Sequence, residues 1–169
     1  GRAEKAGIRL TYLPFIMKAV TLGLADFPDI NGTIDDERME LVKNSLFNLS
    51  IAVSTDAGLT VPVIQDVGSK SIFELATDLA DLGARAKEGK LRREEFQNGG
   101  FTITSLGALG GMFATPIVNY PEVGILGIHK IEERPVVVDG EIVIRKRMYL
   151  SSSFDHRVID GHVGAGFVQ

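Results

Sequence analysis

One segment near the end of this 169-residue sequence combines residue types that could transfer protons. His156 stands between Asp155 and Arg157, and Asp160 and Gly161 follow closely. Histidine is the side chain that most readily changes its charge near neutral pH, and a nearby carboxylate can alter its proton affinity. If the chain is an enzyme, His156 is therefore the first candidate for a catalytic base.

The same residues also have structural interpretations. A lone histidine at the end of a strand is often a hydrogen-bonded structural residue. Asp160 could cap a helix that begins at Gly161, while Asp155 and Arg157 could form a surface ion pair. From the spacing alone, the catalytic and structural interpretations of His156 stay equally open.

A second candidate lies where the strand-like run 101–106 enters the glycine-rich stretch 107–112. Thr104 and Ser105 both carry hydroxyl groups, but neighbouring residues of a strand face opposite sides, so at most one can point into a given site. The glycine-rich stretch has neither the Walker lysine nor a GxGxxG motif, so it is more typical of a tight loop than of a phosphate cradle.

No metal site is expected. His129 lies in an apolar strand and His162 near a helix start, and neither has a partner at a recognised metal-ligand spacing. We predict structural roles for both. The chain contains no cysteine, which excludes disulfides and cysteine nucleophiles within it and fits a reducing compartment, either the cytoplasm or the mitochondrial matrix of a eukaryote.

The composition is that of one compact domain with a hydrophobic core, since 44% of the residues are hydrophobic. The formal net charge is −4 and no basic patch is evident, so nucleic acid is not expected as a partner. No apolar stretch is long enough to span a bilayer, so a membrane is not expected either.

Helical and strand patterns follow one another irregularly, which indicates a mixed α/β fold. Apolar spacing within 10–27 predicts a helix with Pro14 in its first turn and Pro28 just past its end. Ser71 with Glu74 predicts the capped start of another helix that ends near Lys87. The Asp139–Gly140 pair predicts the turn of a hairpin over 136–144. Further strands are expected over 45–53, 59–64, 101–106, 123–131 and 147–154.

Six segments together resemble the catalytic domain of dihydrolipoamide acyltransferases, the core subunits of 2-oxo acid dehydrogenase complexes. They are residues 11–15, 27–31, 58–64, 100–107, 115–123 and 155–161. The last of these, Asp-His-Arg-Val-Ile-Asp-Gly, is similar to the active-site signature of that family. The resemblance implies a chloramphenicol acetyltransferase-like fold with a mixed central sheet, in a catalytic domain over residues 1–169 that is incomplete at both ends.

The implied reaction passes an acyl group between the thiols of dihydrolipoamide and coenzyme A. His156 would be the general base, because a free thiol with a pKa of about 8.5 is mostly protonated at neutral pH. Coenzyme A would be a substrate, and the lipoyl group would arrive on a separate domain. An acetyl or branched-chain acyl group is preferred over succinyl, because residues 105–111 resemble those subfamilies more.

The resemblance also assigns roles to other residues. Thr104 takes the position at which the family usually has a serine that stabilises the oxyanion, and Ser105 is the alternative if the register slips by one. Asp160 would support the structure around His156. A wall of the substrate channel is implied for the segment that contains Leu59, Thr60 and Val61.

Members of the family form trimers with the active site between subunits. His156 would come from one chain and Thr104 from its neighbour, so we expect the two side chains not to be within hydrogen-bond distance inside one chain. Trimers would build a larger cage. The partners would be lipoyl domains and the decarboxylase and dihydrolipoamide dehydrogenase components.

Two alternatives remain. The chain could be an inactive structural core subunit of the same fold. It could also be a serine hydrolase that uses Ser105, His156 and Asp160, although the sequence has no GxSxG elbow.

Overall fold

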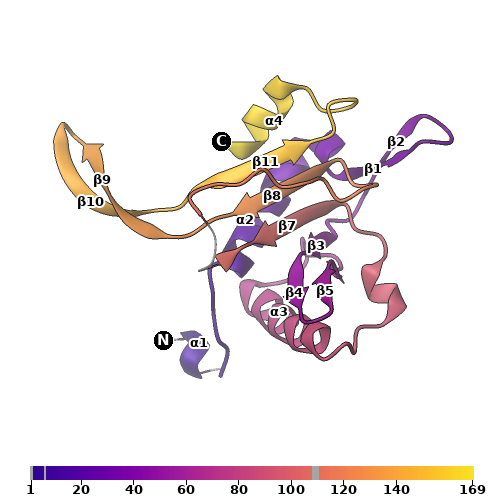
Figure 1. The fold of residues 1–169 in the computed structure, drawn as a ribbon, viewed down its shortest axis with the longest axis horizontal. Helices are drawn as coiled ribbons and strands as arrows, with labels where there is room; N and C mark the ends of the chain where they lie inside the picture. Colours follow the sequence, from indigo (N-terminus) through magenta and orange to yellow (C-terminus); the bar gives the residue numbers. More distant parts are fainter. Residues whose placement is uncertain (1, 6, 108–110) are drawn as a thin grey trace.

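The computed structural model describes residues 2–5, 7–107 and 111–169 of the chain (Figure 1). Its helices are α1 (Arg2–Lys5), α2 (Leu13–Asp26), α3 (Ile72–Lys87) and α4 (Gly161–Val168), with short 3₁₀ turns η1 (Pro28–Ile30) and η2 (Arg93–Phe96). The main sheet consists of β3 (Leu49–Ile51), β6 (Val63–Ile64), β7 (Phe101–Ser105), β8 (Gly124–Ile128) and β11 (Leu150–Phe154). Hairpins are formed by β1 (Gly32–Asp35) with β2 (Glu40–Lys43), by β4 (Val53–Thr55) with β5 (Gly58–Thr60), and by β9 (Glu132–Val138) with β10 (Glu141–Arg147).

The main sheet is mixed, with the strand order β11-β8-β7-β3-β6. Strand β7 runs parallel to both β3 and β8, whereas β11 is antiparallel to β8. All five residues of β8 are buried, as its nearly continuous apolar sequence predicts for a strand covered on both faces. The mixed α/β class that the sequence indicates is therefore present.

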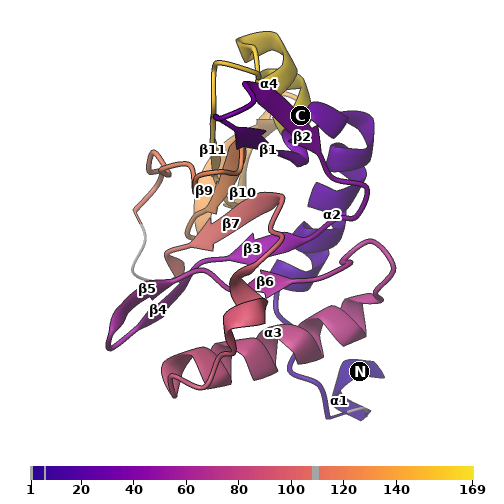
Figure 2. The same cartoon turned by 90° about the vertical axis from the view of Figure 1, so that its right-hand side faces the viewer.

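One face of the sheet is covered by helices. Phe167 of α4 packs against Phe101 of β7 and Phe154 of β11, with ring centroids 5.4 and 6.0 Å apart. It also meets Phe27, just after α2, at 6.2 Å. Figure 2 shows α2 alongside the sheet and α3 beneath it. These aromatic contacts hold α4 against the sheet close to the end of β11.

Helix α3 begins where its sequence predicts. The Ser71 side chain accepts a hydrogen bond from the Glu74 backbone N–H, and the Glu74 carboxylate accepts one from the Ser71 N–H, so the capping box is complete. Gly89, with φ of +67°, follows the last turn. Helix α2 starts at Leu13 and has Pro14 in its first turn, as the sequence predicts.

Two of the predicted strands are each divided into two. Residues 45–53 yield β3 and the start of β4, and residues 59–64 yield β5 and β6 on either side of Pro62. Pro62 has no N–H to donate but its carbonyl still accepts a bond of 2.8 Å from the Ile51 N–H. The hairpin predicted over 136–144 is longer than expected, because charged cross-strand pairs such as Glu133 with Lys146 extend it beyond its apolar part. Strand β1 was not predicted.

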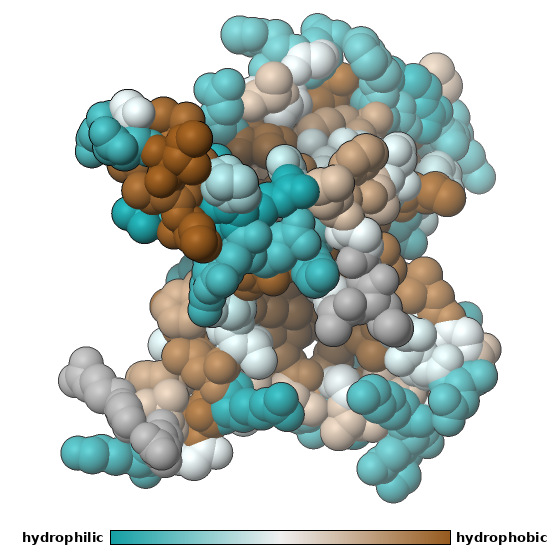
Figure 3. Space-filling model, turned by 60° about the vertical axis from the view of Figure 1, so that its left-hand side comes forward, coloured by the Kyte–Doolittle hydropathy of each residue, from teal (hydrophilic) through white to brown (hydrophobic). Residues whose placement is uncertain are grey.

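The β9–β10 hairpin extends away from the body of the structure (Figure 1). Asp139 and Gly140 both have positive φ at its turn, as the sequence predicts. One face of the hairpin carries the exposed apolar residues Val137, Ile142 and Ile144. Figure 3 shows this side of the molecule, where hydrophobic surface covers a projecting lobe. In the described part of the chain, no helix is both long and apolar enough to cross a membrane.

The docking of α4 makes a prediction about two helical glycines. A Cβ on Gly164 would lie 2.8 Å from the ring of Phe154, whereas one on Gly83 of α3 would have nothing within 4 Å. We expect Gly164→Ala to lower the free energy of unfolding by about 1–3 kcal/mol through overpacking. The control Gly83→Ala should raise it by up to about 1 kcal/mol, because alanine favours a helix. Urea titrations measure both, and equal effects of the two substitutions would contradict the predicted packing.

Candidate active site

His156 lies in a tight turn that connects β11 to α4. The Asp155 N–H donates to the Val123 carbonyl at 2.8 Å and so extends the β8–β11 pairing by one bond. The N–H groups of Val158 and Ile159 both donate to the Asp155 carbonyl, at 3.2 and 3.0 Å, and the Ile159 side chain is buried. The turn is thus fixed on both sides of His156, whose own side chain is 78% exposed.

Asp160 lies beside His156 without forming a hydrogen bond to it. The distance from Nδ1 of His156 to Oδ1 of Asp160 is 4.0 Å, and the Asp160 side chain is 84% exposed. Asp160 occupies the N-cap position of α4, but its side chain makes no capping bond. Both side chains border a groove of about 330 Å³ between β11 and α4. Because the side chains of His156 and Asp160 are both exposed, they can contact a substrate or a second chain.

Thr104 lies at the other end of the same sheet. It pairs with Gly127 on β8, whereas Phe154, two residues before His156, pairs with Gly124. The three residues from Gly124 to Gly127 span about 10 Å, and β7 and β11 are separated from β8 by about 5 Å each. Among the described residues no hydrogen bond joins Thr104 to His156. Within one chain the two side chains are apart, which is the arrangement that the resemblance implies.

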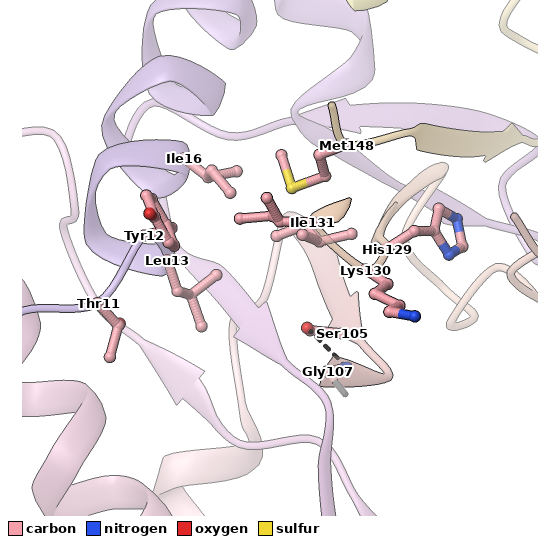
Figure 4. A pocket seen from close by; sticks show the side chains of 11 residues that line it. Thr11, Tyr12, Leu13, Ile16, Ser105, Gly107, His129, Lys130, Ile131 and Met148 are labelled. Atoms are coloured by element: carbon pink, nitrogen blue, oxygen red, sulfur yellow. Dashed lines mark hydrogen bonds between the residues drawn. The ribbon is translucent and has the colours of Figure 1, made fainter. Parts of the chain in front are cut away.

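Thr104 and Ser105 point to opposite faces of the sheet. Ser105 is on the helix-covered face and lines a pocket of about 490 Å³ at the start of α2 (Figure 4). There its hydroxyl accepts a bond of 3.3 Å from the Gly107 N–H, and the pocket around it is mainly apolar. Thr104 is on the opposite, hydroxyl-rich face. Ser105 pairs with Ile128 on β8 and is thus even further from the Gly124 end, so the fold separates Ser105 from His156 as well.

The hydroxyl-rich face contains a buried carboxyl group that the sequence analysis missed. Glu122 is 4% exposed and accepts hydrogen bonds from the hydroxyls of Ser50 and Thr102, and Thr102 is on the same face of β7 as Thr104. Burial raises the pKa of Glu122, while the hydrogen bonds from these hydroxyls oppose that shift. Gly99 lies directly against this group, since a Cβ there would overlap the side chains of Ser50 and Glu122. The one signal in the sequence is a lone acidic residue at the entrance to an all-apolar strand.

The predicted channel segment lies at the Thr104 end. The Ala52 N–H donates to the Ile103 carbonyl at 3.0 Å, so the β4–β5 hairpin continues from β3 beside the end of β7. Thr60 pairs with Val53 in that hairpin, and the neighbouring Leu59 is exposed. The structure thus brings Leu59, Thr60 and Val61 to the region of Thr104 and away from His156.

The two remaining histidines differ in their surroundings. His129 is buried, and its Nε2 lies 2.8 Å from the Ser151 hydroxyl, which fits the predicted structural role. His162 is exposed in the first turn of α4. Within the ranges that the structure describes, no cluster of three or more histidine, cysteine or acidic residues could hold a metal ion.

Comparisons with known proteins identify the family of this chain. The family model for the 2-oxoacid dehydrogenases acyltransferase catalytic domain matches residues 1–169. This chain belongs to that family. The lipoamide acyltransferase component of the branched-chain alpha-keto acid dehydrogenase complex of Pseudomonas putida is 47% identical over 161 residues. The dihydrolipoyllysine-residue acetyltransferase component of the pyruvate dehydrogenase complex of Bacillus subtilis is 46% identical over 159 residues.

The chain spans only part of these acyltransferases. The two alignments cover 95% and 94% of the chain but 38% and 36% of the respective relatives. A solved structure of Azotobacter vinelandii dihydrolipoamide acetyltransferase superposes with a TM-score of 0.93 at 44% identity, over 98% of this chain and 68% of that one. A chloramphenicol acetyltransferase superposes with a TM-score of 0.56 at 16% identity, over 98% of this chain and 77% of its own, so the likeness concerns the fold alone. The predicted fold is confirmed.

The buried carboxyl group makes a prediction about pH. Because the pKa of Glu122 is raised in the folded state, its contribution to stability is complete at low pH and is lost as pH rises through the raised value. Glu122→Gln resembles the protonated form at every pH. We therefore expect the wild type to lose stability relative to the variant as the pH rises above the ordinary glutamate pKa of 4.5, by about 1.4 kcal/mol for each pH unit by which the raised pKa exceeds that value. Urea titrations at a series of pH values measure the difference, and a difference that does not change with pH would contradict the assignment.

Proposed function

We propose that this domain transfers an acyl group between dihydrolipoamide and coenzyme A, with His156 as the general base. The observation that carries the proposal is a shared spacing. The Azotobacter vinelandii structure belongs to a study of the role of one serine, one histidine and one asparagine in the catalytic mechanism. Thr104, His156 and Asp160 have the same spacing along this chain as those three residues, with threonine in place of serine and aspartate in place of asparagine.

The reaction needs one proton acceptor and one hydrogen-bond donor. Neutral His156 removes the proton from the attacking thiol while the sulfur bonds to the thioester carbon. The Thr104 hydroxyl donates a hydrogen bond to the oxyanion that forms. When the intermediate collapses, the carbon–sulfur bond of the original thioester breaks, and the departing thiolate takes the proton back from His156. No acyl-enzyme and no metal are required.

The two groups meet only if two chains cooperate. Thr104 and His156 lie at opposite ends of the sheet in one chain, and His156 is exposed, so the Thr104 end of a neighbour can approach it. We propose a trimer in which each interface joins these two ends, and a larger cage built from trimers. One structural relative at 42% identity is the cubic core of a pyruvate dehydrogenase multienzyme complex, which supports this arrangement. The lipoyl domains, the decarboxylase and the dihydrolipoamide dehydrogenase would then be its partners.

The acyl group we propose is acetyl or branched-chain. The Pseudomonas putida relative, at 47% identity, is a component of a branched-chain alpha-keto acid dehydrogenase complex. The Bacillus subtilis relative, at 46% identity, is a component of a pyruvate dehydrogenase complex. Thr104 retains a hydroxyl donor, which favours an active enzyme over an inactive core subunit.

The proposed role of His156 as the base can be tested by removing its imidazole. We expect His156→Ala to lower kcat for acyl transfer from acetyl-CoA to dihydrolipoamide by about 10²–10⁴-fold. The matched control His162→Ala removes an exposed histidine from the next helix and should leave the rate unchanged. A wild-type rate in His156→Ala would overturn the catalytic assignment, and an inactive wild type would favour the structural-subunit alternative.

The proposed role of Thr104 as the oxyanion donor can be tested in the same assay. Thr104→Val keeps the shape of the side chain but removes its hydroxyl, and we expect kcat to fall by about 10²–10³-fold. Thr104→Ser keeps the hydroxyl and should stay close to the wild-type rate. If valine and serine behave alike, Thr104 is not the donor. The same assay on Ser105→Ala, which we expect to be nearly unaffected, distinguishes the two neighbouring hydroxyls.

The proposed acyl group can be tested with three acyl donors. Rates compared side by side with acetyl-, isobutyryl- and succinyl-CoA should be higher for acetyl or isobutyryl than for succinyl. The ratio of kcat/KM values is the relevant quantity, because it measures discrimination between competing substrates. A preference for succinyl-CoA would contradict the proposed acyl group without affecting the assignment of His156.

A further inference from the structure

We propose that Arg157 is a positioning residue that orients His156 by fastening its turn to the β1–β2 hairpin. This inference rests on the proposed function, in which His156 is the general base. From the sequence alone, Arg157 is expected only to form a surface ion pair.

The Arg157 guanidinium binds two carboxylates at once. Its Nε and Nη2 donate to Asp155, at 3.1 and 2.8 Å, and its Nη1 donates to Oδ1 of Asp36 at 2.8 Å. The backbone N–H of Arg157 also donates to Asp155, at 3.0 Å. The hydrogen bonds from Arg157 lower the pKa of Asp155, so this carboxylate is ionised at neutral pH. A planar guanidinium that is held on two sides has little freedom to rotate.

Three segments that are distant in the sequence meet at this group. Asp36 lies in the connection between β1 and β2, and the Ile34 N–H of β1 donates to the Pro121 carbonyl at 2.8 Å. A hydrogen bond to Asp36 also raises the pKa of Tyr120. The Asp155 N–H donates to the Val123 carbonyl of the same segment. The hydrogen bonds from Arg157 to Asp155 and Asp36 form a clamp. This clamp joins the His156 turn to the β1–β2 hairpin, and both are bonded to the segment that leads into β8.

The surroundings of His156 explain why this clamp matters for catalysis. No hydrogen bond among the described residues orients the imidazole, and its nearest acidic partner, Asp160, is 4.0 Å away. The backbone of the turn must then determine which positions the imidazole of His156 can reach. His156 stands between Asp155 and Arg157, the two residues that the clamp joins. Without the clamp, the turn keeps its backbone hydrogen bonds and the buried Ile159 side chain but loses its side-chain link to the β1–β2 hairpin, so His156 can shift. Small displacements of a catalytic group can cost large factors in rate.

The clamp should affect rate more than stability. The side chains of Arg157 and Asp36 are 54% and 47% exposed, and ion pairs at such positions contribute little to the stability of the fold. Removing either partner should therefore leave the melting temperature nearly unchanged. A residue that only supports the fold would show the opposite pattern.

The experiment compares Arg157→Gln, Asp36→Asn and Arg157→Lys in the acyl-transfer assay, with melting temperatures measured in parallel. We expect Arg157→Gln and Asp36→Asn each to lower kcat by about tenfold, with KM for both substrates and the melting temperature close to wild type. Arg157→Lys should recover part of the rate, because an ammonium can contact one carboxylate but cannot reproduce the two-sided fork. The double variant Arg157→Gln/Asp36→Asn should be no slower than Arg157→Gln alone, because Arg157→Gln already breaks the contact with Asp36.

Arg38→Gln is the matched control, because Arg38 lies in the same β1–β2 connection but forms its one ion pair among the described residues with Asp35, at 3.7 Å. It should keep the wild-type kcat. Wild-type kcat in both Arg157→Gln and Asp36→Asn, or a fall in kcat that follows a fall in melting temperature, would overturn the inference. His156→Ala, measured beside them, separates the two proposals. If that variant is inactive while Arg157→Gln is fully active, only the positioning role fails, and if it is fully active the proposed function fails.

Discussion

Strand β8 pairs in parallel with β7 and antiparallel with β11, and this double pairing decides where the reactive groups lie. The parallel pairing places Thr104 beside Gly127, and the antiparallel pairing returns the chain to Gly124 before it delivers His156. A shift of one residue in either pairing would turn Thr104 toward the helices or move the His156 turn. Since all of β8 is buried, its apolar side chains resist such a shift. The separation of the two groups within one chain follows from this register, and the proposed site therefore requires a second chain.

The two faces of the sheet serve different purposes. The helix-covered face is apolar and includes the aromatic cluster around Phe167, which secures α4 and so the far side of the His156 turn. The opposite face carries Ser50, Thr102 and Thr104, and buried polar groups there must be hydrogen-bonded or they destabilise the fold. Glu122 meets that requirement for Ser50 and Thr102, which fixes β7 in place two residues before Thr104. The clamp by Arg157 has a similar effect on the turn at the other end.

The sequence predicts much of this structure where the local signal is strong. The capping box at Ser71, the Asp139–Gly140 turn and the all-apolar strand around β8 are present as expected, because each depends on neighbouring residues alone. The bounds of the strands near Pro62 and of the β9–β10 hairpin differ, because cross-strand pairing within each hairpin sets them and the apolar pattern does not. Glu122 and Arg157 were missed as organising residues for a different reason. Their partners Ser50 and Asp36 are 72 and 121 residues away in the sequence, and only the fold brings them together.

We propose that each active site combines His156 of one chain with Thr104 of a neighbour. Mixed assembly of His156→Ala chains with Thr104→Val chains tests this arrangement, because each variant lacks a different half of the site. If the site lies between subunits, co-assembled trimers should recover up to about a quarter of the wild-type activity, since each interface in a randomly mixed ring has that chance of combining two intact halves. If the mixture is no more active than the two variants assayed separately, although mixed trimers have formed, the two groups do not act across an interface and the account is wrong.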